Sequence, residues 1–458
     1  MSNGKQAVKP ELGDSRAVVS PILPPPDARR PSPPAPSAMP VAMDFVRRAS
    51  RHGVIPSGDG FAGDGCGRRL RIALFTGNYV HIRDGVSLTL NRLVRYLEAH
   101  GHEVLVFAPT VDDPALEPAG TLLPVPSVPA PGRPEYRLSV AFPKKARARL
   151  EAFDPDLVHV ATPDYLGVRA VRWAQKRGVP AVASFHTHFA SYLKYYHLGA
   201  IEPTLWAYGR WFYRHCAQVY VPSEAMAEVL RENGITTPTR LWSRGIEAGR
   251  FAPAKRSAVW RAGHGFRAPV VAFVSRLVWE KGLETFAEVV ERLEREGVPH
   301  HSLIVGDGPA REALERRLTA TVFTGHLEGE ALATAYASSD VFLFPSETET
   351  FGNVTLEAMA SGLPTVAADA SGSRGLVRDG VTGFLCPPGD DAAFYDAVVG
   401  LVRNDRQRVR LGAAARREAL TYDWGAIMDR LVGYYDEVLC GPHAPEVELA
   451  VSPQAVLA

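Results

Sequence analysis

The chain has 458 residues with 46% hydrophobic and 22% charged residues and a formal net charge of +1. At about 150 residues per domain, this length indicates two or three domains with large cores. The near-neutral charge argues against a nucleic-acid-binding protein, and the sequence has no apolar run of about 18 residues that would predict a membrane-spanning helix. The four cysteines are far apart in the sequence, so we expect neither a zinc site nor a disulfide framework, and a reducing cytoplasm is the simplest compartment.

Residues 1–67 differ in composition from the rest of the chain. Nine of the twenty residues from Pro21 to Pro40 are proline. Large apolar side chains are too few there to offset the entropy cost of ordering, so we expect a disordered leader. This stretch also lacks the apolar segment of a signal peptide.

Short apolar runs alternate with helical patterns after Arg69. Ile72–Phe75 predicts a buried strand, and a loop separates it from a helix that begins at Gly85 and carries one apolar stripe. Alternation of this kind indicates a parallel sheet covered by helices on both faces. The further strands expected in this series are Val104–Phe107, Leu157–Val160, Val182–Ser184 and Val219–Val221. The proline-rich stretch Pro109–Pro143 predicts a long, irregular surface excursion.

A second series of the same kind follows Trp242–Pro253, which we interpret as a hinge. Two doubly wound domains in tandem are therefore expected, with ligand bound at the carboxyl ends of the strands. A helical pattern from Trp424 to Val438 closes the fold. The strands expected in the second series are Val270–Val274, Leu303–Val305, Thr321–Phe323, Val341–Phe344 and Thr365–Ala367.

The most informative motif is Glu349-Thr-Phe-Gly-Asn-Val-Thr-Leu-Glu357, which follows a predicted strand and leads into a helix ending near Ala360. We expect Glu349 in the loop before the helix and Glu357 within it. Free backbone N–H groups at Phe351, Gly352, Asn353 and Val354, with the positive end of the helix dipole, suit a diphosphate. The two carboxylates can accept hydrogen bonds from hydroxyl groups on either side of it, as a nucleotide sugar requires. A solvated loop glutamate and an ordinary helix-surface glutamate are the alternative.

Basic residues follow the strand Val270–Val274 in the motif Ser275-Arg276-Leu-Val-Trp-Glu-Lys281-Gly282. A guanidinium and an ammonium at the carboxyl end of a strand can neutralise a leaving diphosphate, although a solvated basic turn remains the alternative. Gly306-Asp-Gly308 follows the next strand. It is a weak dinucleotide signal because Arg311 replaces the third glycine, and a turn that admits the nucleotide base is the preferred interpretation.

Two positions in the first series are further candidates. Gly85 opens a helix and could let its backbone approach a phosphate. His186 follows the strand Val182–Ser184 and could hydrogen-bond a sugar hydroxyl. A turn glycine and a structural histidine are the alternatives. Asp154-Pro-Asp156 has the form of a metal-binding Asp-x-Asp motif, but it precedes a strand, and we interpret it as a turn.

Together with the two-domain pattern, these motifs and Phe185-His186-Thr187 resemble the family 4 retaining glycosyltransferases of GT-B fold, especially bacterial lipid mannosyltransferases and sulfoquinovosyl-diacylglycerol synthases. The resemblance covers roughly Arg69 to Tyr435. It implies an α/β fold of two doubly wound, Rossmann-like parallel-sheet domains facing across a cleft, with a C-terminal crossover helix. The domains implied are a leader (1–67), an acceptor-side domain (68–245), a nucleotide-sugar-binding domain (246–420), the crossover helix (421–440) and a flexible tail (441–458).

The same resemblance assigns roles to the candidate residues. Glu349 and His186 would contact the donor hexose, Glu357 the ribose, and Arg276 and Lys281 the diphosphate. The remaining donor-binding positions would be Gly85, Ser275, Gly306, Phe351, Gly352, Asn353 and Val354. The loop before the first of these reads Arg83-Asp84-Gly85, where the family often has paired glycines. The implied route is front-face transfer, in which the leaving diphosphate helps to deprotonate the acceptor, without a metal or other cofactor.

The resemblance favours GDP-mannose as the donor and a lipid or glycan as the acceptor, at the cytoplasmic face of a membrane. A synthase of glucosyl or sulfoquinovosyl glycolipids that uses a UDP-sugar, and a nucleotide-sugar epimerase, are the alternatives, and no nucleic-acid partner is expected. Aromatic residues over Phe189–Phe212, together with Lys144, Lys145, Arg147 and Arg149, suit the face of an anionic membrane. Core packing of the aromatic side chains and a solvated basic helix are the alternative.

Overall fold

The computed structural model describes residues 68–130, 133–186 and 201–441. The predicted leader (1–67) and nearly all of the predicted tail (441–458) therefore lie outside the described residues, and the predicted domain limits stay predictions. Among the helices in these ranges, none is both long and apolar enough to cross a membrane.

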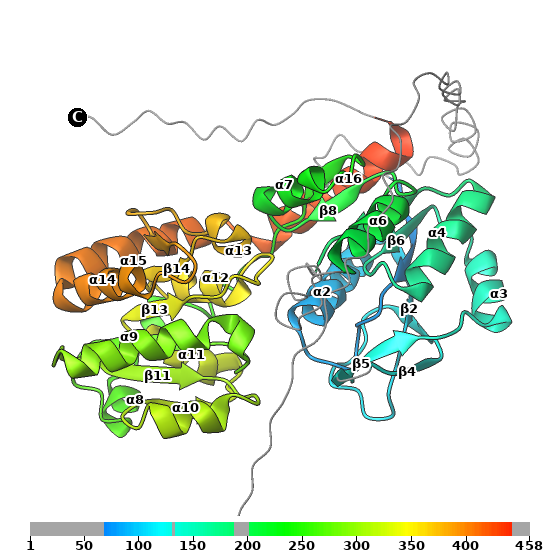
Figure 1. The fold of residues 1–458 in the computed structure, drawn as a ribbon. Coiled ribbons are helices and arrows are strands. Elements are labelled where there is room, and N and C mark those ends of the chain that lie inside the picture. The colour runs from blue at the N-terminus through cyan, green and yellow to red at the C-terminus, as the bar shows by residue number, and fades with distance from the viewer. Residues whose placement is uncertain (1–67, 131–132, 187–200, 442–458) are drawn as a thin grey trace, which may run out of the picture. The chain divides into compact units, whose positions relative to one another are not determined.

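Seven parallel strands form the sheet that we call the N-terminal sheet, in the order β3-β2-β1-β6-β7-β8-β9. Figure 1 labels β2, β6 and β8 of this sheet. Its inner strands are buried on both faces, because every residue of β6, β7 and β8 is buried. Covered faces explain why these strands are continuous apolar runs. The strands are β1 (Arg71–Phe75), β2 (Glu103–Ala108), β3 (Thr121–Pro124), β6 (Leu157–Val160), β7 (Ala181–Ser184), β8 (Val219–Val221) and β9 (Thr239–Leu241). The helices of this region are α2 (Gly85–Ala99), α3 (Lys144–Phe153), α4 (Tyr165–Arg177), α6 (Glu202–Tyr213) and α7 (Glu224–Glu232).

The stretch 109–143, expected to be irregular, contains three strands. Its first strand, β3, pairs in parallel with β2 at the edge of the N-terminal sheet. The other two, β4 (Ser127–Ala130) and β5 (Arg133–Ser139), form an antiparallel hairpin. The expectation was wrong because prolines are tolerated at sheet edges, where a missing N–H costs no ladder hydrogen bond.

Six parallel strands form the C-terminal sheet, in the order β12-β11-β10-β13-β14-β15. The central strands β10 and β13 are wholly buried. The strands are β10 (Val270–Val274), β11 (His301–Val305), β12 (Val322–Gly325), β13 (Val341–Phe344), β14 (Thr365–Ala368) and β15 (Gly383–Cys386). The helices are α8 (Ala258–Gly263), α9 (Leu283–Arg295), α10 (Arg311–Arg317), α11 (Gly329–Ala337), α12 (Asn353–Ala360), α13 (Ser371–Arg374), α14 (Asp391–Arg403) and α15 (Asp405–Ala419), with short 3-10 helices at Pro253–Lys255 (η3) and Trp279–Lys281 (η4).

The last helix, α16 (Trp424–Cys440), packs on the N-terminal sheet although it follows the C-terminal sheet in the chain. Met428, Leu431 and Tyr435 are fully buried in the same cluster as Ile72 and Leu74 of β1. Asp423 caps the helix by accepting a hydrogen bond from the Ala426 amide at 2.9 Å. The expected crossover helix is therefore present.

The cysteines of the described residues differ in their bonding state. Cys216 and Cys386 are free and buried, whereas Cys440 is disulfide-bonded. The expectation of no disulfide is therefore wrong for Cys440, because separation along the chain does not determine which side chains meet in space.

Candidate functional site

The predicted site residues of the C-terminal half follow three adjacent strands. Arg276 follows β10, Gly306 follows β11, and Glu349 follows β13, so all three lie at the carboxyl ends of parallel strands in the C-terminal sheet. The chain builds β11 and β12 on one side of β10 and then β13 to β15 on the other. Such a reversal is where doubly wound sheets bind ligands, and the order of the strands therefore places these motifs at the expected position.

Lys281 and Glu349 form an ion pair beyond the carboxyl ends of these strands. The Nζ atom of Lys281 lies 2.6 Å from Oε1 of Glu349 and 3.3 Å from Oγ1 of Thr348. The lysine side chain is 12% exposed and the carboxylate 22%, so the pair can reach a ligand without being fully solvated. Gly282 has a φ of +76° and lies so close to β13 that an added Cβ would be 2.5 Å from the Pro345 carbonyl oxygen. This glycine lets the lysine loop approach the glutamate loop.

Arg276 is held less firmly than Lys281. Its side chain is 41% exposed, and among the described residues its carboxylate contacts are Glu135 and Glu280, each at 3.9 Å. Gly306 has a φ of +139°, and an added Cβ would lie 1.8 Å from the Ser275 carbonyl oxygen. Gly306 therefore allows the loop after β11 to pack closely against the loop after β10. This packing explains the glycine without a ligand, and the contact with a nucleotide base stays a prediction.

Gly85 and the start of α12, both expected beside a diphosphate, lie close together. Gly352 has a φ of +95° and caps α12, whose first residue is Asn353. A Cβ added at Gly85, the first residue of α2, would lie 2.9 Å from Nδ2 of Asn353. The amino ends of α2 and α12 therefore approach each other closely, and their free N–H groups favour an anion between them. Phe351 is buried and Val354 is half-buried.

His186 is joined to the glutamate loop through its backbone. The Thr350 hydroxyl donates to the His186 carbonyl at 3.0 Å, and the Ser223 hydroxyl lies 3.4 Å from the Thr350 carbonyl. The imidazole is buried, and its Nδ1 atom lies 2.7 Å from Nη2 of Arg244. Burial, then the charge of Arg244, then His159, hold the pKa of His186 well below its usual range. The ring is therefore neutral at physiological pH.

Glu357 lies on α12, where the residue as a whole is half-buried and its carboxyl group is buried. Burial raises the pKa of this carboxyl group to about 7, and the charge of Glu247 adds to the shift, while Tyr336 and Arg250 oppose it. A carboxylate in such surroundings gains from hydroxyl donors supplied by a ligand.

Other predicted features have structural explanations. Of the aromatic side chains expected at a membrane, Trp206 and Phe212 are buried in the core of the N-terminal half, and those within 189–200 lie outside the described residues. Asp154 has a φ of +45° and ends α3, and Asp156 accepts from the Arg71 amide at 2.8 Å, so the Asp-Pro-Asp sequence is a structural turn.

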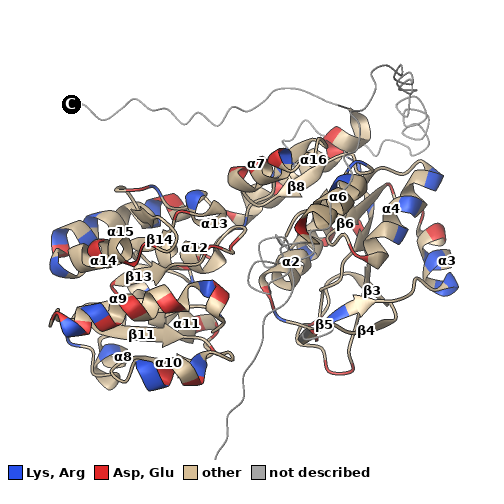
Figure 2. Cartoon of the chain, in the orientation of Figure 1, with Lys and Arg blue, Asp and Glu red and all other residues tan. Residues whose placement is uncertain are grey.

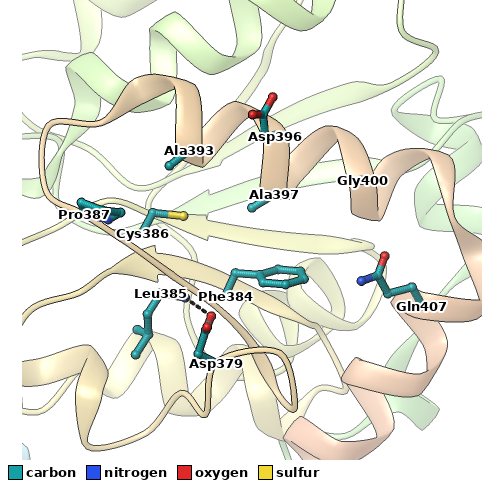
Figure 3. Close-up of a pocket in the computed structure, with 10 residues that line it drawn as sticks. All are labelled: Asp379, Phe384, Leu385, Cys386, Pro387, Ala393, Asp396, Ala397, Gly400 and Gln407. Carbon is teal, nitrogen blue, oxygen red and sulfur yellow. Dashed lines mark hydrogen bonds between the residues drawn. The ribbon is translucent and has the colours of Figure 1, made fainter.

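A surface cavity of about 420 Å³ lies between β15 and the helices α14 and α15 (Figure 3). Its lining includes Asp379, Phe384, Cys386, Asp396 and Gln407, and none of the predicted site residues. Within it, Asp379 accepts a hydrogen bond from the Leu385 amide at 3.0 Å. Burial raises the pKa of the Cys386 thiol to about 12, so this thiol is not a nucleophile at neutral pH. The cavity does not contribute to the site.

Sequence reasoning assigned no role in the site to Thr350 or Arg244, the residues that hold His186. Thr350 stands inside the glutamate motif, and Arg244 in the segment between the two sheets, 58 residues from the histidine it contacts. A threonine beside a predicted site residue is a usable signal, but the sequence contains no signal that joins Arg244 to His186.

Comparison with known proteins defines the class. The model of Glycosyltransferase Family 4 matches residues 83–250, and that of Glycosyl transferases group 1 matches residues 268–404. Sucrose-phosphate synthase from Thermosynechococcus elongatus superposes with a TM-score of 0.68 at 22% identity, covering 82% of this chain and 100% of that one. WaaG, a glycosyltransferase involved in lipopolysaccharide biosynthesis, gives a TM-score of 0.59 at 16% identity, with coverage of 81% and 100%. The fold is GT-B.

Sequence relatives give the family. A GDP-mannose-dependent alpha-mannosyltransferase of Mycolicibacterium smegmatis is 37% identical over 379 residues, covering 81% of this chain and 98% of the relative. Sulfoquinovosyl transferase SQD2 of Arabidopsis thaliana is 34% identical over 373 residues, covering 79% and 72%. The chain belongs to the family 4 glycosyltransferases, and the predicted fold class and enzyme class are confirmed.

Proposed function

We propose that this glycosyltransferase transfers mannose from GDP-mannose to a lipid or glycan acceptor, with retention of configuration at the anomeric carbon. The observation that carries the proposal is the meeting of the amino ends of α2 and α12, beside which Lys281 and Glu349 supply a cation and a carboxylate. The choice of donor follows from relatives whose names specify GDP-mannose and which match this chain over nearly their whole length.

Donor binding uses the helix termini and the cations. The diphosphate would lie against the free N–H groups at Gly85 and Asn353, where the helix dipoles favour negative charge. Lys281 would turn from Glu349 to a phosphate oxygen. Arg276, whose contacts with Glu135 and Glu280 are 3.9 Å long, would turn to another phosphate oxygen. Glu349 would then accept hydrogen bonds from hexose hydroxyls, and Glu357 from the ribose.

Transfer follows as the bond between the anomeric carbon and the diphosphate breaks. The electron pair goes to the diphosphate oxygen, whose charge Arg276, Lys281 and the helix termini stabilise. The acceptor oxygen bonds to the anomeric carbon from the same face, and its proton passes to the departing diphosphate. Since protein cations neutralise the leaving group, we propose that the reaction needs no metal.

We propose a peripheral contact with the cytoplasmic face of an anionic membrane, where a lipid acceptor resides. The surface that supports it runs from the β4–β5 hairpin to α3. Leu138 is 46% and Val140 52% exposed, and the exposed Lys144 and Lys145 follow within a few residues. Figure 2 shows the basic residues on α3. Apolar side chains beside cations suit an anionic lipid surface.

Vesicle sedimentation tests the membrane contact. Wild-type protein should bind vesicles containing anionic lipid, and exchanging both Leu138 and Val140 for serine should weaken that binding. The matched control is Val259→Ser, which alters an apolar side chain that is 84% exposed on α8. Equal binding by all three proteins would argue against this surface.

The transfer itself is tested with GDP-[14C]mannose, UDP-glucose and UDP-sulfoquinovose as donors and lipid extracts as acceptors. GDP-mannose should label a lipid or glycan product, and Glu349→Ala should abolish labelling while the exposed neighbour Glu347→Ala retains it. Labelling from a UDP-sugar instead would support the glycolipid-synthase alternative, which the relative SQD2 favours. Conversion of donor alone to an epimer would identify an epimerase.

A further inference from the structure

The segment between the two sheets carries a buried arginine that contacts the predicted site. Arg244 is 6% exposed. Its Nη1 atom donates to the carbonyl oxygens of Trp242 and Ser243 at 2.9 and 3.4 Å, and its guanidinium lies 5.3 Å from the centre of the Trp242 ring. No carboxylate of the described residues lies within 4 Å of it. Burying a cation without a carboxylate partner costs folding free energy.

The second nitrogen of this guanidinium contacts His186. Nη2 of Arg244 lies 2.7 Å from Nδ1 of the imidazole. Because a guanidinium can only donate hydrogen bonds, Nδ1 must accept and therefore carries no proton. In a neutral imidazole the proton then resides on Nε2.

The other ring nitrogen of His186 has no hydrogen-bond partner within the described ranges. This atom, Nε2, is buried. The Thr350 hydroxyl fixes the histidine backbone, and the Trp242 ring packs edge-on against the imidazole at 5.3 Å. A buried N–H group that is held in place and unpaired is a donor available to a ligand oxygen.

We propose that Arg244 is a positioning residue for sugar recognition: by donating to Nδ1 it holds His186 in the Nε2–H tautomer, so that the ring presents a hydrogen-bond donor to an oxygen of the donor hexose. The hexose contact rests on the proposed function, whereas the tautomer does not. In the part of the chain that the structure describes, the charged or titratable groups facing the ring are Arg244 and His159, and both oppose its protonation. His159 is itself buried and pairs with Tyr435 and Ser184.

The tautomer is tested first by NMR of the full chain labelled with 15N-histidine. His186 is assigned by the signal that disappears in His186→Gln. Wild-type protein should show an unprotonated Nδ1 and a protonated Nε2 from about pH 5 to 8. Arg244→Met should populate the other tautomer and raise the pKa of the ring. The control Arg231→Met, which changes an exposed arginine of α7, should leave the signal as in wild type. A protonated Nδ1 in wild type, or an unchanged tautomer in Arg244→Met, would overturn the proposal whatever the activity.

Kinetics then test positioning. Arg244→Met should lower kcat/KM for the sugar donor by roughly 10- to 100-fold, as is typical when an outer partner that orients a functional histidine is lost. Arg244→Lys, which keeps a hydrogen-bond donor, should restore part of the activity. The double variant with His186→Gln should be no worse than His186→Gln alone. Additive losses, or a changed tautomer with wild-type transfer, would refute the role of Arg244 and leave the proposed function standing. If Arg244→Met does not fold, the wild-type spectrum and Arg244→Lys decide the outcome.

Discussion

The buried carboxyl group of Glu357 should make the stability of this protein depend on pH. Burial raises its pKa from 4.5 to about 7. The folded chain therefore binds more protons than the unfolded chain between these values, and stability falls as the pH rises through this window. A shift of this size corresponds to an upper limit of roughly 3 to 4 kcal/mol, and the full penalty applies above about pH 7.

Exchanging the carboxyl group for an amide removes this penalty. Glu357→Gln should be more stable than wild type by about 1–3 kcal/mol near pH 8 and about equal to it near pH 4. Scanning calorimetry at both values should show a higher Tm for the variant only at the higher pH. The same variant should bind the donor more weakly, because an amide offers one acceptor oxygen in place of two to the ribose hydroxyls.

A matched control is Glu312→Gln on α10, where the side chain is 82% exposed. Its Tm should stay close to that of wild type at both values, since an exposed side chain contributes little. A Glu357→Gln variant that is destabilised near pH 8, or stabilised equally at both values, would refute the assignment of the penalty to this buried carboxyl group.

Three further substitutions test contacts that stabilise the fold around the two sheets. Gly306→Ala places a Cβ against the Ser275 carbonyl oxygen in a left-handed conformation, and should cost several kcal/mol, on the order of 2–4, in chemical denaturation. Tyr435→Phe removes the 2.7 Å partner of buried His159 and should lower stability by about 1–2 kcal/mol, with a lower Tm. Arg317→Met breaks ion pairs to three glutamates of α9 and should cost about 1 kcal/mol at low salt and less at high salt.

Each of these three predictions has an opposing result. A Gly306→Ala chain as stable as Gly380→Ala, where nothing lies within 4 Å of the added Cβ, would show that the close approach to β10 is not needed. An unchanged Tm for Tyr435→Phe would contradict a stabilising role for the hydrogen bond between Tyr435 and His159. A loss in Arg317→Met that persists at high salt would point to lost packing of the arginine stem.

The sequence predicts the buried inner strands well and the edges poorly. The apolar runs of β1, β10 and β13 are recognisable because both faces of the sheet are covered. β9 and β15 have only three and four residues and lie at sheet edges, where Thr239, Arg240 and Gly383 leave no apolar run to recognise. These two strands are defined by their pairing with β8 and β14, which no feature of their own residues reveals.

The candidate site also contains some features that the sequence predicts and others that it does not. Lys281 and Glu349 could be placed near each other because each lies in the loop region that follows one of two neighbouring strands. The burial of Glu357 depends on packing against residues such as Tyr336, and the contact between Arg244 and His186 depends on where the chain passes between the sheets. Neither the burial of Glu357 nor the contact between Arg244 and His186 could be predicted from a periodicity or a residue spacing in the sequence.

The most direct test of the central claim, that a diphosphate lies at the meeting of α2 and α12 beside Lys281, is calorimetric titration of GDP. Wild-type protein should bind GDP, and Lys281→Met should weaken the affinity by about 10-fold or more, while Lys176→Met on α4 should not change it. Equal affinity for GDP in wild type and Lys281→Met, or no binding of any nucleoside diphosphate to wild type, would contradict the account.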